Sequence, residues 1–142
     1  MKLSQILFTI ATGLVALVKA DGISTDGISG NRDCASANVH FALKDTTGRS
    51  PYVSDCKAVA DGNTEDIPVG KDMVLRSYGS CTYQFALWEG TSMTINHGQL
   101  EGLFNLVKDN TAITFANGYR MESHGTITCG TATVNFRIFQ PS

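Results

Sequence analysis

Apolar residues recur with helical spacing in one stretch near the middle of the chain. Four of them stand at i, i+3, i+4 and i+7, which puts their side chains on one helix face: Leu100, Leu103, Phe104 and Val107. Asn96 precedes the stretch, and Gln99 stands three residues later, as in a capping box. The pattern predicts an amphipathic helix over residues 97–109 that buries one face.

A second, shorter helix is predicted between Ser54 and Gly62. Three residues share one face at i, i+3 and i+4: Cys56, Val59 and Ala60. Ser54 is the expected N-cap, Asp55 lies in the first turn where the helix dipole favours it, and Gly62 can end the helix. A cysteine on the apolar face indicates that this helix is bonded to the layer beneath it.

The other apolar segments alternate with a period of two, which is typical of half-buried strands. The predicted strands are 39–43, 73–78, 81–87, 92–95, 119–129 and 131–139, the last two forming a hairpin around Gly130. Residues 63–71 read as a polar loop. Because strands cluster instead of alternating with helices, we predict an α+β fold. Its antiparallel sheet has about four to six strands and is covered by two helices.

The first twenty residues are predicted to be a signal peptide. Lys2 is followed by a largely apolar run, and Val18-Lys19-Ala20 offers a cleavage site before Asp21. The run is too short and too interrupted for a membrane span. Residues 21–32 are polar and glycine-rich, which predicts a flexible N-terminal arm. Residues 33–142 are then expected to form a single domain.

All four cysteines follow the predicted cleavage site: Cys34, Cys56, Cys81 and Cys129. An even number in a small secreted chain predicts two disulfides, and the spacing leaves all three pairings open. Zinc sites need close ligand pairs, which these spacings do not supply. We therefore expect neither a metal nor a cofactor.

The net charge of the chain excludes some classes of binding partner. Without residues 1–20 the chain has nine Lys and Arg against 13 Asp and Glu, a net charge of −4. Nucleic-acid binding needs clustered positive charge, and anionic membranes attract it, so we expect neither partner. The net charge does not identify the partner that remains.

The most specific catalytic set in the sequence is Arg120, Glu122 and His124. A secreted ribonuclease needs two acid–base groups and a cation for the phosphate, and these residues would lie at alternate positions of one strand. Polar residues also alternate on any sheet face that meets water, so we expect no catalytic residues and no enzyme. His97 and Glu101, at i and i+4, are expected to form a surface pair.

Two other side chains are candidates for a functional role. His40, the remaining histidine, lies in a predicted strand and could supply an acid–base group. Trp88 is the only tryptophan, beside the Glu89-Gly90 turn. An exposed aromatic ring could stack on a sugar or a partner, but a carbohydrate-binding face usually has several, so we expect Trp88 to pack against the fold.

The cysteines and their neighbours resemble a known family. The segments are Arg32-Asp33-Cys34, Ser50-Pro51 with Asp55-Cys56, Tyr78-Gly79-Ser80-Cys81-Thr82-Tyr83, the helix that begins after Asn96, and Gly125-Thr126-Ile127-Thr128-Cys129. Together they resemble the fungal secreted effector domain of the necrosis-inducing factor family, over about residues 31–139. Members tend to carry a tryptophan between the second and third cysteines, and residues 61–76 have none.

The resemblance implies a killer-toxin-like fold and a disulfide-bonded protein of the host apoplast that has no catalytic residues. We therefore predict a secreted fungal effector, linked with virulence or necrosis, that acts as a monomer. Its expected partner is a host or competitor-microbe protein or a cell-surface component. Two alternatives stay open. One is a small secreted ribonuclease. The other is an antimicrobial, channel-directed toxin, which the acidic charge disfavours because cationic toxins reach negative cell surfaces more easily.

Overall fold

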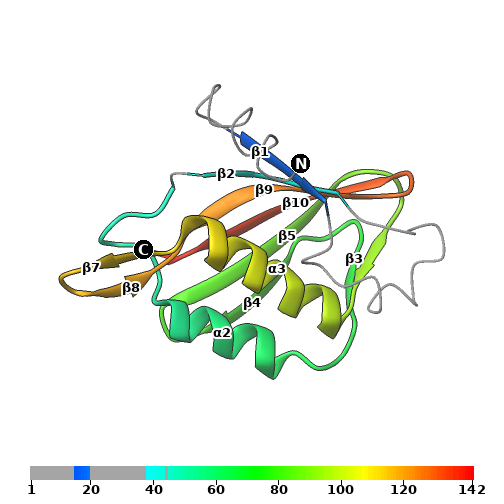
Figure 1. Cartoon of the computed structure of the whole chain (residues 1–142). Helices are drawn as coiled ribbons and strands as arrows, with labels where there is room; N and C mark the ends of the chain where they lie inside the picture. Colours follow the sequence, from blue (N-terminus) through cyan, green and yellow to red (C-terminus); the bar gives the residue numbers. More distant parts are fainter. Residues whose placement is uncertain (1–14, 20–37, 44) are drawn as a thin grey trace.

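The computed structural model describes residues 15–19, 38–43 and 45–142, and Figure 1 shows how these segments are arranged. The described strands form a main antiparallel sheet with two helices side by side on one face (Figure 1). Across the sheet the order is β1 (Val15–Lys19), β2 (Asn38–Ala42), β9 (Ser123–Cys129), β10 (Ala132–Phe139), β5 (Cys81–Glu89) and β4 (Val74–Tyr78). The predicted α+β architecture is confirmed.

Strand β1 lies inside the predicted signal peptide. Its backbone pairs antiparallel with β2, from Val15 opposite Ala42 to Lys19 opposite Asn38. The other five strands of the main sheet follow the predicted cleavage site. The signal peptide stays a prediction, and its removal would leave β2 as the sheet edge. The predicted arm at residues 21–32 lies outside the described residues.

The two helices bury the faces that their periodicity predicts. Helix α2 (Val53–Gly62) buries Cys56, Val59 and Ala60, and helix α3 (His97–Thr111) buries Leu100, Leu103, Phe104 and Val107. Both halves of the capping box before α3 are present. The Asn96 side chain accepts from the Gln99 N–H at 2.9 Å, and the Asn96 N–H donates to Gln99 Oε1 at 3.0 Å. Burial of these faces against the sheet supplies most of the helices' stability.

The predicted cap of the first helix is wrong. Tyr52, not Ser54, occupies the N-cap position of α2, and its side chain makes no capping hydrogen bond. The Tyr52 backbone pairs with Arg120 in an isolated bridge, and its N–H donates to Ser80 Oγ at 2.9 Å. These contacts with distant residues fix where the helix begins, and local sequence does not contain them.

Two further sheets of two strands each lie beside the six-stranded sheet in the described residues. Strand β3 (Ile67–Val69) pairs with β6 (Met93–Ile95), and β7 (Ile113–Phe115) pairs with β8 (Gly118–Arg120). The prediction of a loop over residues 63–71 is therefore wrong at β3. Ile67 and Val69 are buried on either side of the exposed Pro68, and three residues are too few to give a periodic signal.

The predicted strand over residues 119–129 is divided in two. Met121 and Glu122 lie between β8 and β9 because their N–H groups have other partners. The Met121 N–H donates to the Pro51 carbonyl at 3.1 Å, and the Glu122 N–H donates to Thr46 Oγ1 at 3.0 Å. The hairpin of β9 and β10 around Gly130 is confirmed, with Gly130 at a φ of 61°.

The hydrophobic core fills the space between the helices and one face of the sheet. Cys81, Tyr83 and Phe85 alternate along β5 into this core, as predicted. The hydroxyl of the buried Tyr83 donates to the Cys56 carbonyl at 3.1 Å, and burial raises the pKa of this phenol well above its ordinary value. The core therefore contains no unpaired polar side chain among the described residues.

A disulfide joins helix α2 to the sheet. Cys56 and Cys81 are bonded, and the neighbouring Asp55 carboxylate accepts from the Ser80 N–H at 2.8 Å and from the Ser80 hydroxyl at 2.7 Å. Gly79 has a φ of 55°, and a Cβ there would lie 2.6 Å from Asp55 Oδ2. Only glycine suits this turn. The Asp-Cys and Tyr-Gly-Ser-Cys segments behind the family resemblance are therefore parts of one structural clasp.

One of the two predicted disulfides is thus described. Cys129, at the end of β9, is buried and is not a free thiol. Cys34 lies outside the described residues.

Candidate functional site

The structure does not bring the predicted ribonuclease residues together at one site. Arg120 is 6% exposed, and its guanidinium lies 4.1 Å from the centre of the Tyr52 ring. Its Nη1 donates to the Ser50 carbonyl at 2.6 Å, and its Nε and Nη2 donate to Asn117 at 3.2 Å. An arginine held on three sides by the protein stabilises the fold and is poorly placed to bind a phosphate.

The Glu122 side chain also interacts with Ser50. Its Oε1 accepts from the hydroxyl of the buried Ser50 at 2.7 Å. That hydroxyl oxygen also accepts from the Thr47 N–H at 2.8 Å. Ser50, Arg120 and Glu122 thus form a clamp that fastens residues 46–51 to β8 and the start of β9.

His124 lies apart from that clamp, on the face of the sheet away from the helices. Its Nδ1 pairs with Asp45 Oδ2, and its side chain is mostly exposed. Because a carboxylate can only accept, Nδ1 carries the proton and Nε2 is directed elsewhere. The prediction that Glu122 and His124 share one face of a strand is wrong, since Glu122 precedes β9 and points to Ser50.

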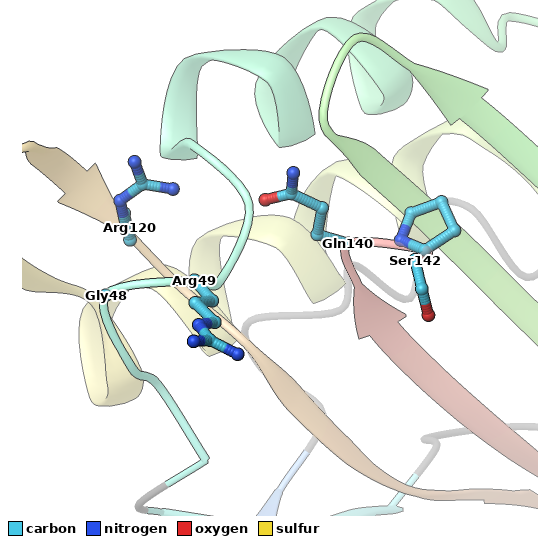
Figure 2. A pocket seen from close by; sticks show the side chains of 6 residues that line it. Gly48, Arg49, Arg120, Gln140 and Ser142 are labelled. Atoms are coloured by element: carbon cyan, nitrogen blue, oxygen red, sulfur yellow. The ribbon is translucent and has the colours of Figure 1, made fainter.

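The depression that contains Arg120 lies at the end of the sheet. It measures about 510 Å³ and is lined by Gly48, Arg49, Arg120, Gln140, Pro141 and Ser142. Figure 2 shows the Arg49 and Arg120 side chains extending in opposite directions, so their charges do not converge on one point. Half of the lining belongs to the last three residues of the chain. Neither His124 nor Glu122 takes part.

A second depression lies on the open face of the sheet, which we define by the outward-facing residues of β2, β9, β10 and β5. It measures about 270 Å³ and is lined by Gln84, His124, Gly125, Asn135, Phe136 and Arg137. Arg137 stands directly opposite His124 on β9 and opposite Gln84 on β5. Three polar residues from three strands therefore form one row, with side chains about 5 Å apart at Cβ.

His40 belongs to the same open face. It lies on β2 opposite Thr126, two residues along β9 from His124, and so is a diagonal neighbour of that histidine. Gly125 lets the two strands approach, because a Cβ at this position would clash with the His40 carbonyl oxygen. The open face thus carries two of the three histidines.

The third histidine, His97, takes part in a charged cluster between the two helices. Its Nε2 lies 3.4 Å from Glu101 Oε2, so the predicted surface pair is confirmed. Lys57 Nζ donates to Asp61 at 2.7 Å and lowers the pKa of that carboxyl. Burial, and then the hydrogen bond and charge of Asp61, raise the pKa of Glu101. Glu101 therefore takes up a proton before Asp61 does.

Trp88 does not pack against the fold as predicted. Its side chain is 66% exposed at the end of β5, where the register between β5 and β10 shifts. Met73 and Leu75 are also largely exposed on the neighbouring β4 segment. The exposed aromatic ring is available for contact with a partner.

Sequence reasoning missed Asp45, Gln84 and Arg137 as site residues. The alternation of Asn135 and Arg137 with Val134 and Phe136 already placed both polar residues on one face. What the sequence does not contain is the register that sets Arg137 between His124 and Gln84. No strong local motif marks a row built from three strands.

Among the described residues, no cluster of three or more His, Cys, Asp or Glu could hold a metal ion. No helix within the described segments is long and apolar enough to cross a membrane. No protein-family model and no curated protein sequence matches this chain. The resemblance to the necrosis-inducing factor family therefore stays a prediction.

Proposed function

We propose that this chain is a secreted fungal effector, killer-toxin-like in fold, that acts in the host apoplast by binding a host or competitor target. The observation that carries the proposal is the division of its polar residues. Arg120 and Glu122 are engaged within the fold, whereas on the open face the side chains of Gln84, Asn135 and Arg137 have no hydrogen-bond partner among the described residues. A disulfide-stabilised scaffold with one such face suits recognition.

Infiltration of the purified, oxidised protein into host leaf tissue tests this function. We expect a local response at the infiltrated site in susceptible genotypes and reduced virulence of a deletion strain. Reduced and alkylated protein is the matched control, since it has the same sequence without the disulfides. Absence of a response in every genotype, together with full virulence of the deletion strain, would overturn the proposal.

A ribonuclease remains the second candidate because of one observation. The pair of His124 with Asp45 fixes the imidazole tautomer, and His40 and Arg137 lie nearby on the open face. If this set is catalytic, the pure protein will digest RNA, and His124→Ala will abolish digestion while Glu122→Gln will not. No RNA cleavage at high protein concentration would remove this candidate.

We also propose a second disulfide between Cys34 and Cys129. These are the two cysteines left once Cys56 and Cys81 are paired, and no described cysteine is free. Such a bridge would tie the N-terminal part of the domain to the end of β9, and its long loop could add about 4 kcal/mol of stability. Peptide mapping of the non-reduced protein should recover the two segments as one linked product. Free thiols at both positions would contradict it.

A further inference from the structure

We propose that the depression on the open face binds one anionic sugar unit, that is, a sugar ring carrying a single carboxylate, sulfate or phosphate. The inference rests on the proposed binding function and assigns to it a site and a ligand class. Its four side chains, Gln84, His124, Asn135 and Arg137, come from three neighbouring strands.

The positive charge at this site has no internal partner. Among the described residues, no carboxylate lies within ion-pair distance of the exposed Arg137, whose guanidinium lies 4.1 Å from the centre of the Phe139 ring. This contact along β10 holds the guanidinium near the sheet while leaving its N–H groups to a ligand. Arg120, by contrast, uses its N–H groups within the fold.

His124 supplies a second polar group beside Arg137. Asp45 holds Nδ1, so Nε2 is the ring atom left for a ligand. No acidic residue lines the depression. A ligand oxyanion beside the guanidinium would therefore meet the N–H donors of Arg137 and no carboxylate in the lining.

The two amides indicate a sugar. Gln84 and Asn135 line the depression, and neither side chain has a hydrogen-bond partner among the described residues. Each amide can donate and accept, which matches the hydroxyl groups of a sugar ring. The volume of about 270 Å³ is just below the range for drug-sized ligands, so it suits one ring.

The same charges argue against a nucleic-acid strand. The one arginine in the lining can neutralise a single anionic group, whereas a strand needs a row of cations. The net charge of −4 expected after signal-peptide removal would also repel a polyanion. An acidic sugar at a chain end or in a cell-surface glycan satisfies the site with one charge.

Titration of the purified, secreted, oxidised protein by ¹H–¹⁵N NMR tests the site. The probes are galacturonate, glucose 6-sulfate and glucose 6-phosphate, which separate the three anion chemistries, with neutral galactose as the control. We expect shifts confined to the open face around residues 84, 124, 135 and 137. At least one anionic probe should bind with a Kd of about 1 mM, and galactose at least about tenfold more weakly.

Variants assign the binding to these residues. Arg137→Met should weaken it at least about tenfold, and Arg49→Met, which removes an exposed arginine from the other depression, should leave it unchanged. Gln84→Ala provides the same test if Arg137→Met does not fold. Four results would overturn the proposal: no shifts with any anionic probe, equal binding of galactose, wild-type binding by Arg137→Met, or tighter binding of an RNA oligonucleotide than of every sugar.

The outcomes separate the site from the proposed function. Sugar binding without any leaf response would keep the site and remove the effector function. A leaf response without sugar binding would keep the effector function and remove the site.

Discussion

The two faces of the main sheet differ in the kind of side chain they carry and in how those side chains are packed. On the helix-covered face, apolar side chains alternate along β5, β9 and β10 and pack under α2 and α3. On the open face, the intervening positions carry His40, His124, Asn135 and Arg137, with few contacts among them. The covered face determines the fold, because burying its apolar surface is what drives folding. The open face contributes little to stability, so its residues can be used for recognition.

Arg120 and Arg137 show the same difference between two residues of one type. Arg120 is buried and bonded to Ser50 and Asn117. Arg137 is exposed, its guanidinium lies over the Phe139 ring, and it has no ion-pair partner among the described residues. Both occur in alternating polar patterns, and the sequence pattern favours Arg120, not Arg137, as the candidate phosphate ligand. Burial and hydrogen-bond partners distinguish a structural arginine from one that can bind a ligand.

The largest expected effect concerns the covered face. Replacement of Cys56 and Cys81 together by serine should lower the free energy of unfolding by about 3–4 kcal/mol, because the bridge closes a loop across 25 residues of sequence separation. Urea denaturation measures this loss in the free energy of unfolding. Thr126→Ser on the open face is the control and should stay within about 0.5 kcal/mol of the wild type. A loss below about 1 kcal/mol for the double variant would mean that the clasp is not a main stabilising element.

The next largest effect on the free energy of unfolding is expected when Arg120 and Arg137 are each replaced by methionine. Arg120→Met should cost about 1–3 kcal/mol, since the Ser50 carbonyl and the Asn117 side chain lose their donor. Arg137→Met removes the same charge from the open face and should change the free energy of unfolding by less than about 0.5 kcal/mol. Equal losses in the two variants would contradict the distinction drawn between them.

Capping of α3 should have a smaller effect. Asn96→Ala removes the side-chain acceptor for the Gln99 N–H and should cost about 1 kcal/mol. Asn135→Ala removes an asparagine from the open face and is the matched control, with no expected change in thermal midpoint. If both variants have the same thermal midpoint as the wild type, the capping box makes no measurable contribution to stability.

The smallest effect should appear at Glu101 and should depend on pH. Because the folded pKa of this carboxyl is raised, its contribution to stability is complete below its ordinary pKa and is lost as pH rises through the folded pKa. Glu101→Gln should therefore raise the thermal midpoint at pH 7, and the gain should vanish below about pH 4.

Asp61→Asn is the control for that titration and should behave in the opposite way. Lys57 lowers the pKa of Asp61, so the stability from this carboxylate is present at neutral pH and is lost as pH falls through the folded pKa. A destabilising Glu101→Gln at pH 7 would show that its pairing with His97 outweighs its repulsion from Asp61.

The covered face could be predicted from the sequence because its signals are local and periodic. Helix α3 with its Asn96 cap, the alternation along β5 and the hairpin at Gly130 all follow from residues within one turn or strand. The predictions failed where contacts with residues distant in sequence determine the ends of a helix or strand. Tyr52, not Ser54, begins α2 because of contacts with β8 and Ser80, and the 119–129 strand breaks at Glu122 because of Thr46.

The candidate site depends on the same kind of nonlocal information. His124 was recognised as a polar strand residue, but its partner Asp45 lies 79 residues away in sequence. The row of His124, Arg137 and Gln84 arises only when β9, β10 and β5 take this register. One-strand periodicity identifies which face a residue occupies, and only strand pairing identifies its neighbours.

Leaf infiltration of two matched variants tests most directly whether the open face carries the function. Arg137→Met alters that face, and Lys57→Met removes an exposed positive charge from helix α2. If both proteins unfold like the wild type, we expect Arg137→Met to lose the leaf response and Lys57→Met to keep it at the same dose. A full response from Arg137→Met, or its loss in both variants, would contradict the account.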